Sequence, residues 1–128
     1  MKKTNMPSQR QIRFGEIIRS IISETISRDY IFSENIDITT VTVSFVKMSK
    51  DLRIASIYIM PLGGKNKDEI LETFNKNKFI FQTALSRAKL KSKFTPTINF
   101  HIDNSYDEAE KIEKLLSNKK VTRDLNNE

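Results

Sequence analysis

The segment from Lys76 to Lys93 is where phosphate-binding chemistry is easiest to place in this 128-residue chain. It carries six basic residues and no acidic one, whereas both signs of charge are mixed elsewhere. Ammonium and guanidinium groups contact phosphate oxygens, which positions a nucleic acid without reading its sequence. A second interpretation stays open here, in which these side chains only form the solvated edges of a helix.

Catalytic chemistry is harder to place. The single histidine, His101, lies two residues before Asp103, so the pair could orient an imidazole on one face of a strand. The alternative is an ordinary surface histidine. The chain has no Cys, which excludes thiolate nucleophiles and thiolate-bound zinc. Neither a P-loop nor a G-x-G-x-x-G loop is present. We therefore expect no catalytic residue, no cofactor, no metal site and no small-molecule substrate.

The overall charge agrees with a polyanionic partner. The formal net charge is +6 and the sequence pI is near 9.6, a balance typical of proteins that bind nucleic acid. No apolar run approaches the length of about 18 residues that crosses a membrane. The basic residues before Pro7 lead into no apolar segment, so a signal peptide is not expected. With no Cys, these features favour a cytoplasmic protein without a membrane partner.

The first element that must position these cations is a helix. Ser8 and Gln11 have the spacing of a capping box. Isoleucines then recur at helical intervals, Ile17 among them, and the charged residues fall elsewhere. The pattern predicts an amphipathic helix over residues 8–29.

Two strands are predicted next, over residues 38–48 and 52–62, because Val, Ile, Thr and aromatic residues alternate in both. Residues 49–51 between them are short enough for a hairpin. In the first strand, Phe45 is expected on the buried face with the valines.

The second half of the chain is predicted to hold a helix pair, a strand and a short helix. A cap signal at 66–69 opens the first helix, and polar residues 75–78 interrupt its apolar spacing, so a kink is expected there. The second helix is expected to end near Lys89. Alternation over 97–103 predicts a third strand, and the capping-box spacing of 105–108 predicts a final helix.

Three apolar residues follow the predicted kink, and they could stack on bases. Helical spacing favours the core for Ile80 and Phe81 and leaves Phe79 open. The predicted elements together favour an α+β domain in which helices cover one face of a three-stranded sheet. This domain is expected over residues 8–117, between flexible segments at 1–7 and 118–128.

Three segments together resemble one bacterial family. VTVSFVKMSKDLRIASIYIMPLGG carries a Ser-x-Asp-Leu-Arg hairpin, KFTPTINFHIDNSYDEAEKIEKLL carries Pro96, Phe100, Asp103 and a leucine pair, and QRQIRFGEIIRSIISETI forms the first helix. In this order and spacing they resemble ribosome-binding factor A over about residues 8–117.

This resemblance implies a type II KH-like domain with the order α-β-β-α-kink-α-β, a three-stranded sheet and a short C-terminal helix. The usual G-x-x-G loop is absent. Lys76-Asn77-Lys78 stands where the family has an Ala-x-Gly or Ala-x-Pro break, and Phe81 stands where it has an Arg.

The resemblance also implies a function. The family binds the free small (30S) ribosomal subunit and its 16S rRNA during late maturation, assists processing of the RNA 5′ end, is not enzymatic, and suits adaptation to cold. We therefore predict a monomeric RNA-binding assembly factor. The candidate phosphate contacts are Arg10, Arg13, Lys50, Arg53, Lys76, Lys78, Arg87, Lys89, Lys91 and Lys93. A small DNA-binding regulator and a protein-interaction adaptor are the alternatives.

Overall fold

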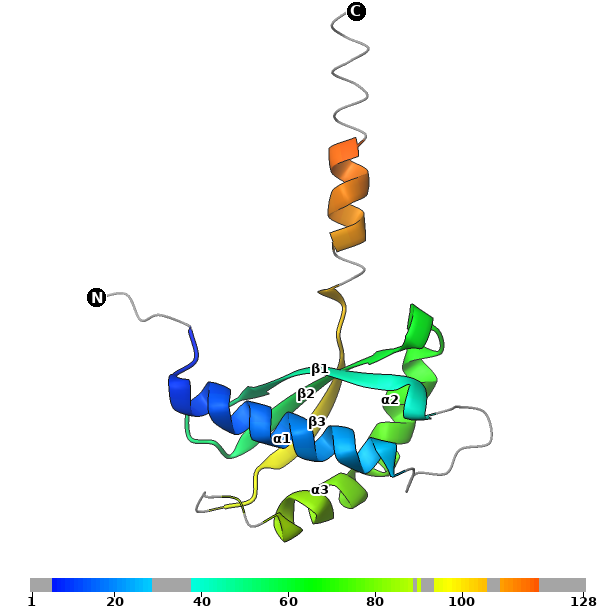
Figure 1. Ribbon diagram of the computed structural model, residues 1–128. Coiled ribbons are helices and arrows are strands. Elements are labelled where there is room, and N and C mark those ends of the chain that lie inside the picture. The colour runs from blue at the N-terminus through cyan, green and yellow to red at the C-terminus, as the bar shows by residue number, and fades with distance from the viewer. Residues whose placement is uncertain (1–5, 29–37, 89, 91–93, 106–108, 118–128) are drawn as a thin grey trace, which may run out of the picture.

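The computed structural model describes residues 6–28, 38–88, 90, 94–105 and 109–117. Figure 1 shows the elements in these ranges. In order they are α1 (Gln9–Ser27), β1 (Val41–Met48), β2 (Ile54–Pro61), α2 (Lys67–Lys76), α3 (Lys78–Arg87) and β3 (Thr97–Ile102), with 3₁₀ turns at Ile38–Thr40 and Leu62–Gly64. Residues 109–117 are helical. The order of elements predicted from periodicity, and with it the α+β class, is confirmed.

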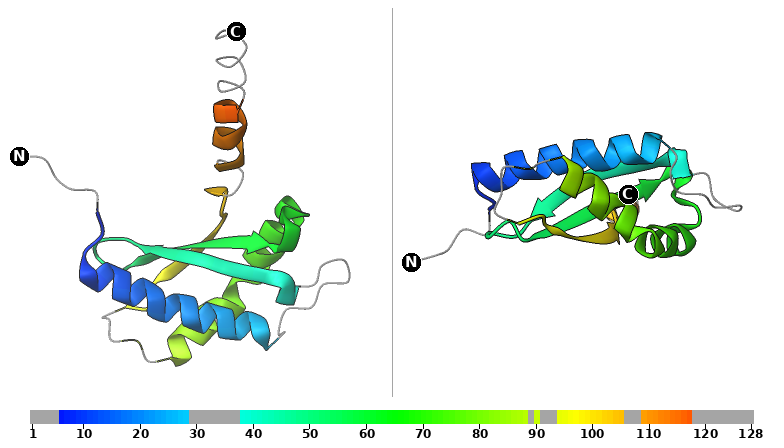
Figure 2. Two further views of the ribbon diagram at one scale, coloured as in Figure 1. Left: turned by 45° about the horizontal axis from the view of Figure 1, so that its top comes forward. Right: turned by 90° about the horizontal axis from the view of Figure 1, so that it is seen from below.

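The sheet of the described chain is mixed, in the order β1-β2-β3. β1 is antiparallel to β2, whereas β3 is parallel to β2. Parallel neighbours need a crossover connection, and α2 and α3 supply it. α1, α2 and α3 lie against one face of the sheet, whereas the helix at 109–117 projects away from the sheet on the other side (Figures 1 and 2). The face opposite α1, α2 and α3 is called the open face below.

The start of α1 agrees closely with its sequence signal. The Ser8 backbone N–H donates to Gln11 Oε1 at 2.7 Å, and the Gln11 N–H donates to Ser8 Oγ at 3.2 Å. These two bonds form the capping box and satisfy N–H groups that the helix itself leaves free. The helix ends at Ser27, two residues before the predicted end.

The buried stripe of α1 differs from the prediction at Ile17. Ile17 is 50% exposed, while Phe14, Ile18 and Ile22 are buried. The stripe follows i, i+4 spacing from Phe14, which turns Ile17 toward solvent. Gly15 lies beside this stripe, where α1 approaches β1 so closely that a β-carbon would sit 2.8 Å from the Val46 carbonyl oxygen.

Three phenylalanines join the crossover helices to the sheet. The rings of Phe74 in α2 and Phe81 in α3 stack with centroids 5.5 Å apart. Both meet Phe100 of β3 edge-to-face, at 5.2 and 5.1 Å. Edge-to-face pairs are a favoured aromatic geometry. The prediction that Phe81 belongs to the core is confirmed, and Ile80 packs against that core while remaining half-buried.

The prediction that Phe45 lies on the buried face is wrong. Val43 pairs with Ile59, but Phe45 pairs with Tyr58, so Ser44 is an extra residue in β1. An extra residue of this kind, a β-bulge, shifts side-chain alternation by one position. Phe45 therefore turns to the open face, and Val46 packs against the core in its place.

The later cap signals give a mixed outcome. α2 begins directly after Asn66, as expected, but Asn66 is left-handed at φ 59° and its side chain makes no cap bond. Gly63, at φ 72°, makes the turn before it, a conformation that glycine adopts without strain. The capping box predicted at 105–108 lies mostly outside the described residues.

Candidate nucleic-acid interface

The predicted kink is present, and Asn77 makes it. This residue has φ −105° and ψ 19°, and it separates α2 from α3. Its backbone N–H and its side-chain Nδ2 both donate to the Thr73 carbonyl, at 3.1 and 2.8 Å. The doubled bond ends α2 without a glycine or proline. α3 then starts without a side-chain cap. In its first turn the Ile80 N–H donates to the Asn77 carbonyl at 3.0 Å, and this end of α3 is the positive end of its helix dipole.

The two lysines beside the kink have different partners. Lys76 Nζ lies 3.0 Å from Glu72 Oε1, and both side chains are mostly exposed. An exposed i, i+4 pair contributes only a few tenths of a kcal/mol, so a phosphate can compete for this lysine. Lys78 is half-buried, and its Nζ donates to Asn99 Oδ1 at 3.2 Å. No carboxylate of the described residues pairs with Lys78, so its charge is held at the β3 edge without being neutralised.

Phe79 is the next residue after Lys78. Its side chain is 66% exposed at the first turn of α3, while Phe81, two residues later, is fully buried. The sequence leaves open whether Phe79 belongs to the core, and its exposure shows that it does not. Phe81, which occupies the place of an Arg in the family pattern, is unavailable for any contact with RNA.

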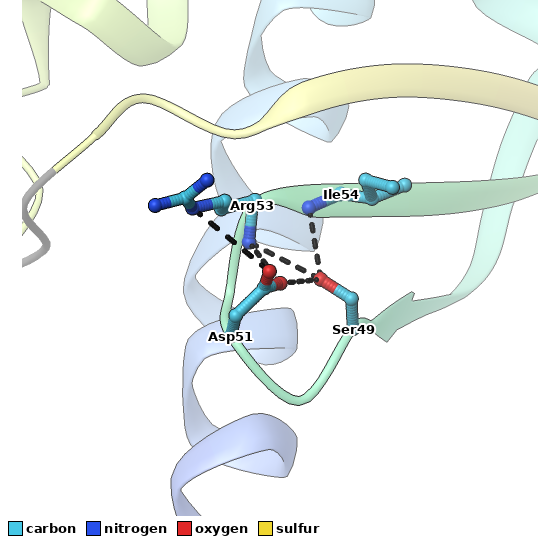
Figure 3. A network of polar contacts seen from close by, with 4 residues as sticks. All are labelled: Ser49, Asp51, Arg53 and Ile54. Atoms are coloured by element: carbon cyan, nitrogen blue, oxygen red, sulfur yellow. Dashed lines mark hydrogen bonds and ion pairs between the residues drawn. The ribbon is translucent and has the colours of Figure 1, made fainter.

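The β1–β2 hairpin is held by a network around one serine (Figure 3). Ser49 Oγ donates to Asp51 Oδ1 at 2.6 Å and accepts from the backbone N–H groups of Arg53 and Ile54 at 3.1 and 3.0 Å. The hydroxyl of Ser49, and then the N–H of Arg53, hold the pKa of Asp51 below its ordinary value. The network fixes the backbone of the turn, so it sets the direction in which Lys50 and Arg53 leave the sheet.

Replacing the central hydroxyl tests this network. Ser49→Ala is expected to raise the pKa of Asp51 toward its ordinary value and to lower Tm by a few degrees at neutral pH. Because the folded-state pKa is depressed, its stabilising effect is present above the unfolded pKa and is lost as pH falls through the folded value. The Tm difference between wild type and variant should therefore shrink in acid. NMR titration of the Asp51 carboxyl measures the shift, and Ser20→Ala on α1 serves as the control. An unchanged pKa for Asp51 would contradict the role of Ser49.

Arg53 has several neighbours at the same end of the sheet. Its guanidinium lies 4.9 Å from the centre of the Phe94 ring, and its Nε is 3.9 Å from Asp51 Oδ2. Its carbonyl accepts from the Thr97 N–H at 2.8 Å, which joins the hairpin to the start of β3. Arg53 is thus a positioned cation whose charge is partly compensated by Asp51.

The start of α1 reaches the same end of the molecule. Gln11 Nε2 donates to the Met48 carbonyl at 3.0 Å, which ties the first turn of α1 to the end of β1. A groove of about 230 Å³ between them is lined in part by Lys47 and Lys50. Arg10 and Arg13 are exposed in the first two turns of α1, and no carboxylate of the described residues pairs with either of them. The structure therefore brings Arg10, Arg13, Lys50 and Arg53 to one end.

Among the described residues, the cations of the basic stretch seen in the sequence lie in separate surroundings. Lys76 and Lys78 lie at the kink, whereas Arg87 lines a cavity of about 560 Å³ between the last turns of α1 and α3, together with Glu24 and Arg28. That cavity is at the opposite end of α1 from Arg10, roughly 20 Å away at 1.5 Å per residue. Three further candidates, Lys89, Lys91 and Lys93, lie outside the described residues.

The open face holds aromatic residues that sequence reasoning missed. Phe45 stacks on Tyr58 with ring centroids 4.4 Å apart, and Tyr58 stacks on His101 at 5.1 Å. Alternation alone assigns Phe45 to the core, because the bulge at Ser44 leaves no signal in the residue pattern. His101 is exposed, as expected for a surface histidine. The Asp103 carboxylate accepts from the Ser105 N–H at 3.0 Å, and the hydrogen bonds from Ser105 hold the pKa of Asp103 below its ordinary value.

Within the described ranges, no three His, Asp or Glu side chains are grouped to bind a metal ion. None of the helices described has the length and apolar character needed to cross a membrane.

Comparison with known proteins places these features in a family. The family model of ribosome-binding factor A matches residues 10–116. Ribosome-binding factor A of Rhodopseudomonas palustris strain BisB18 is 42% identical over 92% of this chain and 85% of its own length. The protein of the same name from Ruegeria sp. strain TM1040 is 39% identical over 93% of this chain and 90% of its own.

Solved structures have the same fold. A Thermotoga maritima protein studied by NMR has a TM-score of 0.64 and 26% identity, over 77% of this chain and 91% of its own. Ribosome-binding factor A of Thermus thermophilus has a TM-score of 0.58 and 18% identity, over 72% and 94%. A model of the Thermus protein has also been fitted into a cryo-electron-microscopy map of its complex with the 30S subunit. With a family match across most of its length and relatives near 40% identity, the chain belongs to the ribosome-binding factor A family.

Proposed function

We propose that this protein binds the free 30S subunit through 16S rRNA, with the Lys76–Lys78 kink as its central phosphate contact. The observation that carries the proposal is the environment of Lys78. Its ammonium group is fixed by the neutral amide of Asn99 rather than by a carboxylate, so the full charge is available to an anion. The positive end of the α3 dipole, which has no side-chain cap, adds to this attraction.

Further cations extend the contact surface. Thr97 joins the hairpin, with Lys50 and Arg53, to the strand that carries Asn99. The first turn of α1, with Arg10 and Arg13, is tied to the end of β1 next to the same hairpin. An extended polyanion can therefore follow the β3 edge from the kink to the hairpin end. Contacts of this kind fix position and shape rather than sequence.

The proposed role is assembly rather than catalysis. The protein acts in late maturation of the subunit, supports processing of the 16S rRNA 5′ end, and works in the cytoplasm as a monomer. Membership of the ribosome-binding factor A family supports this role, as does the 30S complex described for the Thermus relative. Attraction between cations and RNA needs no bond to be broken.

Salt dependence of binding to purified 30S subunits tests the mechanism. If about six phosphate contacts form on unpaired RNA, log affinity should fall with log salt at a slope of about −4, at roughly −0.7 per contact. A fourfold rise in salt then weakens binding by about two to three orders of magnitude. Sedimentation of the purified protein with 30S subunits at several salt concentrations measures the slope. A slope near zero would reject the phosphate-contact mechanism.

Competition in the same assay separates the proposal from its alternatives. Unlabelled rRNA should displace the protein from 30S subunits, while duplex DNA at equal nucleotide concentration should not. Displacement by DNA would favour a DNA-binding regulator. Binding that neither competitor affects would favour an adaptor that contacts ribosomal proteins.

A further inference from the structure

The open face carries a continuous row of aromatic rings across all the strands of the described sheet. Phe45 of β1 and Tyr58 of β2 stack with 18° between their planes, and Tyr58 and His101 of β3 stack with 27°. Phe45 pairs with Tyr58 in the antiparallel register, and Tyr58 pairs with His101 in the parallel one. The bulge at Ser44 is what brings Phe45 into this row. Without that extra residue, Phe45 would point into the core.

The row ends at the edge of the sheet with a free ring. β3 is an edge strand of the described sheet, so no strand lies on the far side of His101, and His101 is exposed. A base placed on that side would continue the stack at ordinary ring spacing. Stacking on an aromatic side chain is the usual way in which unpaired bases are held, and it tolerates any base. The 4.4 Å spacing within the row leaves no room for insertion between Phe45 and Tyr58.

Polar groups around the row suit a nucleotide. Asn99 lies two residues before His101 on the same face of β3, about 7 Å along the strand. It holds the ammonium group of Lys78 at 3.2 Å. Lys47 Nζ lies 5.8 Å from the centre of the Phe45 ring and 5.6 Å from that of Tyr58. The exposed ring of His101 thus lies near the fixed ammonium group of Lys78 at the sheet edge. The ammonium group of Lys47 lies over the other end of the row.

The acidic group near the row is already engaged. Asp103 accepts a hydrogen bond from the Ser105 N–H at 3.0 Å, and Ser105 and then Ser44 hold the pKa of its carboxyl below the ordinary value. Its charge lies beyond the end of β3, on the side away from Asn99 and Lys78. A phosphate approaching His101 from the Lys78 side therefore meets the cation first.

We propose that the open face is a second RNA-binding surface, where an unpaired base of single-stranded RNA stacks on His101 and its phosphate lies at Lys78. This inference rests on the proposed function, because it uses the same RNA and the same lysine. It adds a sequence-tolerant contact on the sheet face opposite α1, α2 and α3. It also gives RNA leaving the kink a defined path around the β3 edge.

A fluorescent base tests the stack. A short, uridine-rich single-stranded RNA carrying one 2-aminopurine should lose fluorescence when it binds the full-length protein, because stacking quenches this base. His101→Ala should abolish the quenching and weaken binding about tenfold. His101→Phe keeps a flat ring and should restore both. Because neither change removes a charge that contacts phosphate, the salt slope should stay as in wild type, and Tm should show that both variants are folded.

The outcomes separate this inference from the proposed function. If His101→Ala binds and quenches as wild type does, the stacking site is rejected, while a salt-dependent affinity for 30S subunits leaves the proposed function standing. If both His101 variants lose binding alike, the imidazole acts by hydrogen bonding and the stacking site is again rejected. If His101→Ala weakens association with 30S subunits but not with the RNA, the face binds a ribosomal protein instead. A wild-type protein that binds neither RNA nor 30S subunits would reject both proposals.

Discussion

Lys76→Glu combined with Lys78→Glu is expected to weaken binding to 30S subunits by about a hundredfold at low salt. A hydrogen bond from a charged group contributes roughly 1.5–3 kcal/mol, so each lost contact corresponds to about tenfold or more. Two contacts are lost, and two carboxylates are placed where phosphates lie. The slope of log affinity against log salt should also become shallower by about 1.4. Sedimentation binding at several salt concentrations measures both quantities.

The chain offers a closely matched control. Lys111 and Lys114 are exposed on the C-terminal helix, and Lys114 Nζ lies 3.8 Å from Glu110 as part of an i, i+4 pair. Lys76 makes the same kind of pair with Glu72. Lys111→Glu with Lys114→Glu therefore changes the net charge by the same amount at a different place. Equal losses for the two double variants would mean that overall charge, rather than the kink, attracts the RNA.

Gly15→Val is expected to destabilise the fold by about 3 kcal/mol and to lower Tm by roughly 10 °C. A glycine within a helix is usually replaced by alanine with a gain of about 1 kcal/mol. Here any β-carbon would lie 2.8 Å from the Val46 carbonyl oxygen, and a backbone atom of a paired strand cannot move aside cheaply. Thermal unfolding followed by circular dichroism gives Tm.

Ser20→Val separates packing from helix propensity. Ser20 is exposed on the same helix, so its replacement brings the same branched side chain without the contact to β1. We expect a change within about 0.5 kcal/mol. If Gly15→Val were as mild as Ser20→Val, α1 would not need its close approach to the sheet. Gly15→Ala should also be destabilising, which reverses the sign normally seen for this substitution in a helix.

Local signals in the sequence are sufficient for much of the fold. The Ser8–Gln11 capping box, the hairpin after Met48 and the break near Asn77 each depend on residues close together in the chain, and each is present. The errors arise where local pattern and tertiary packing differ. Phe45 is misplaced because a bulge changes side-chain direction without changing residue types, and Ile17 because two neighbouring helical stripes are both apolar.

The candidate site is only partly readable from the sequence. Six cations lie within 18 residues, but Lys78 and Arg87 are at opposite ends of α3 and lie in different surroundings. The amide that holds Lys78 comes from Asn99, which is 21 residues away. No local pattern predicts such a partner. The row formed by Phe45, Tyr58 and His101 depends likewise on the register of three strands.

The three buried phenylalanines have a consequence for how the kink behaves. Phe74 lies in the last turn before Asn77 and Phe81 in the first turn after it, and their rings stack on each other and both pack against Phe100 of the sheet. The two helix segments are therefore joined to a common support on each side of the break. The kink is preorganised rather than a hinge, so RNA bound there as proposed would cost little conformational entropy. A weak, reversible contact can then be selective for the curvature of the RNA backbone.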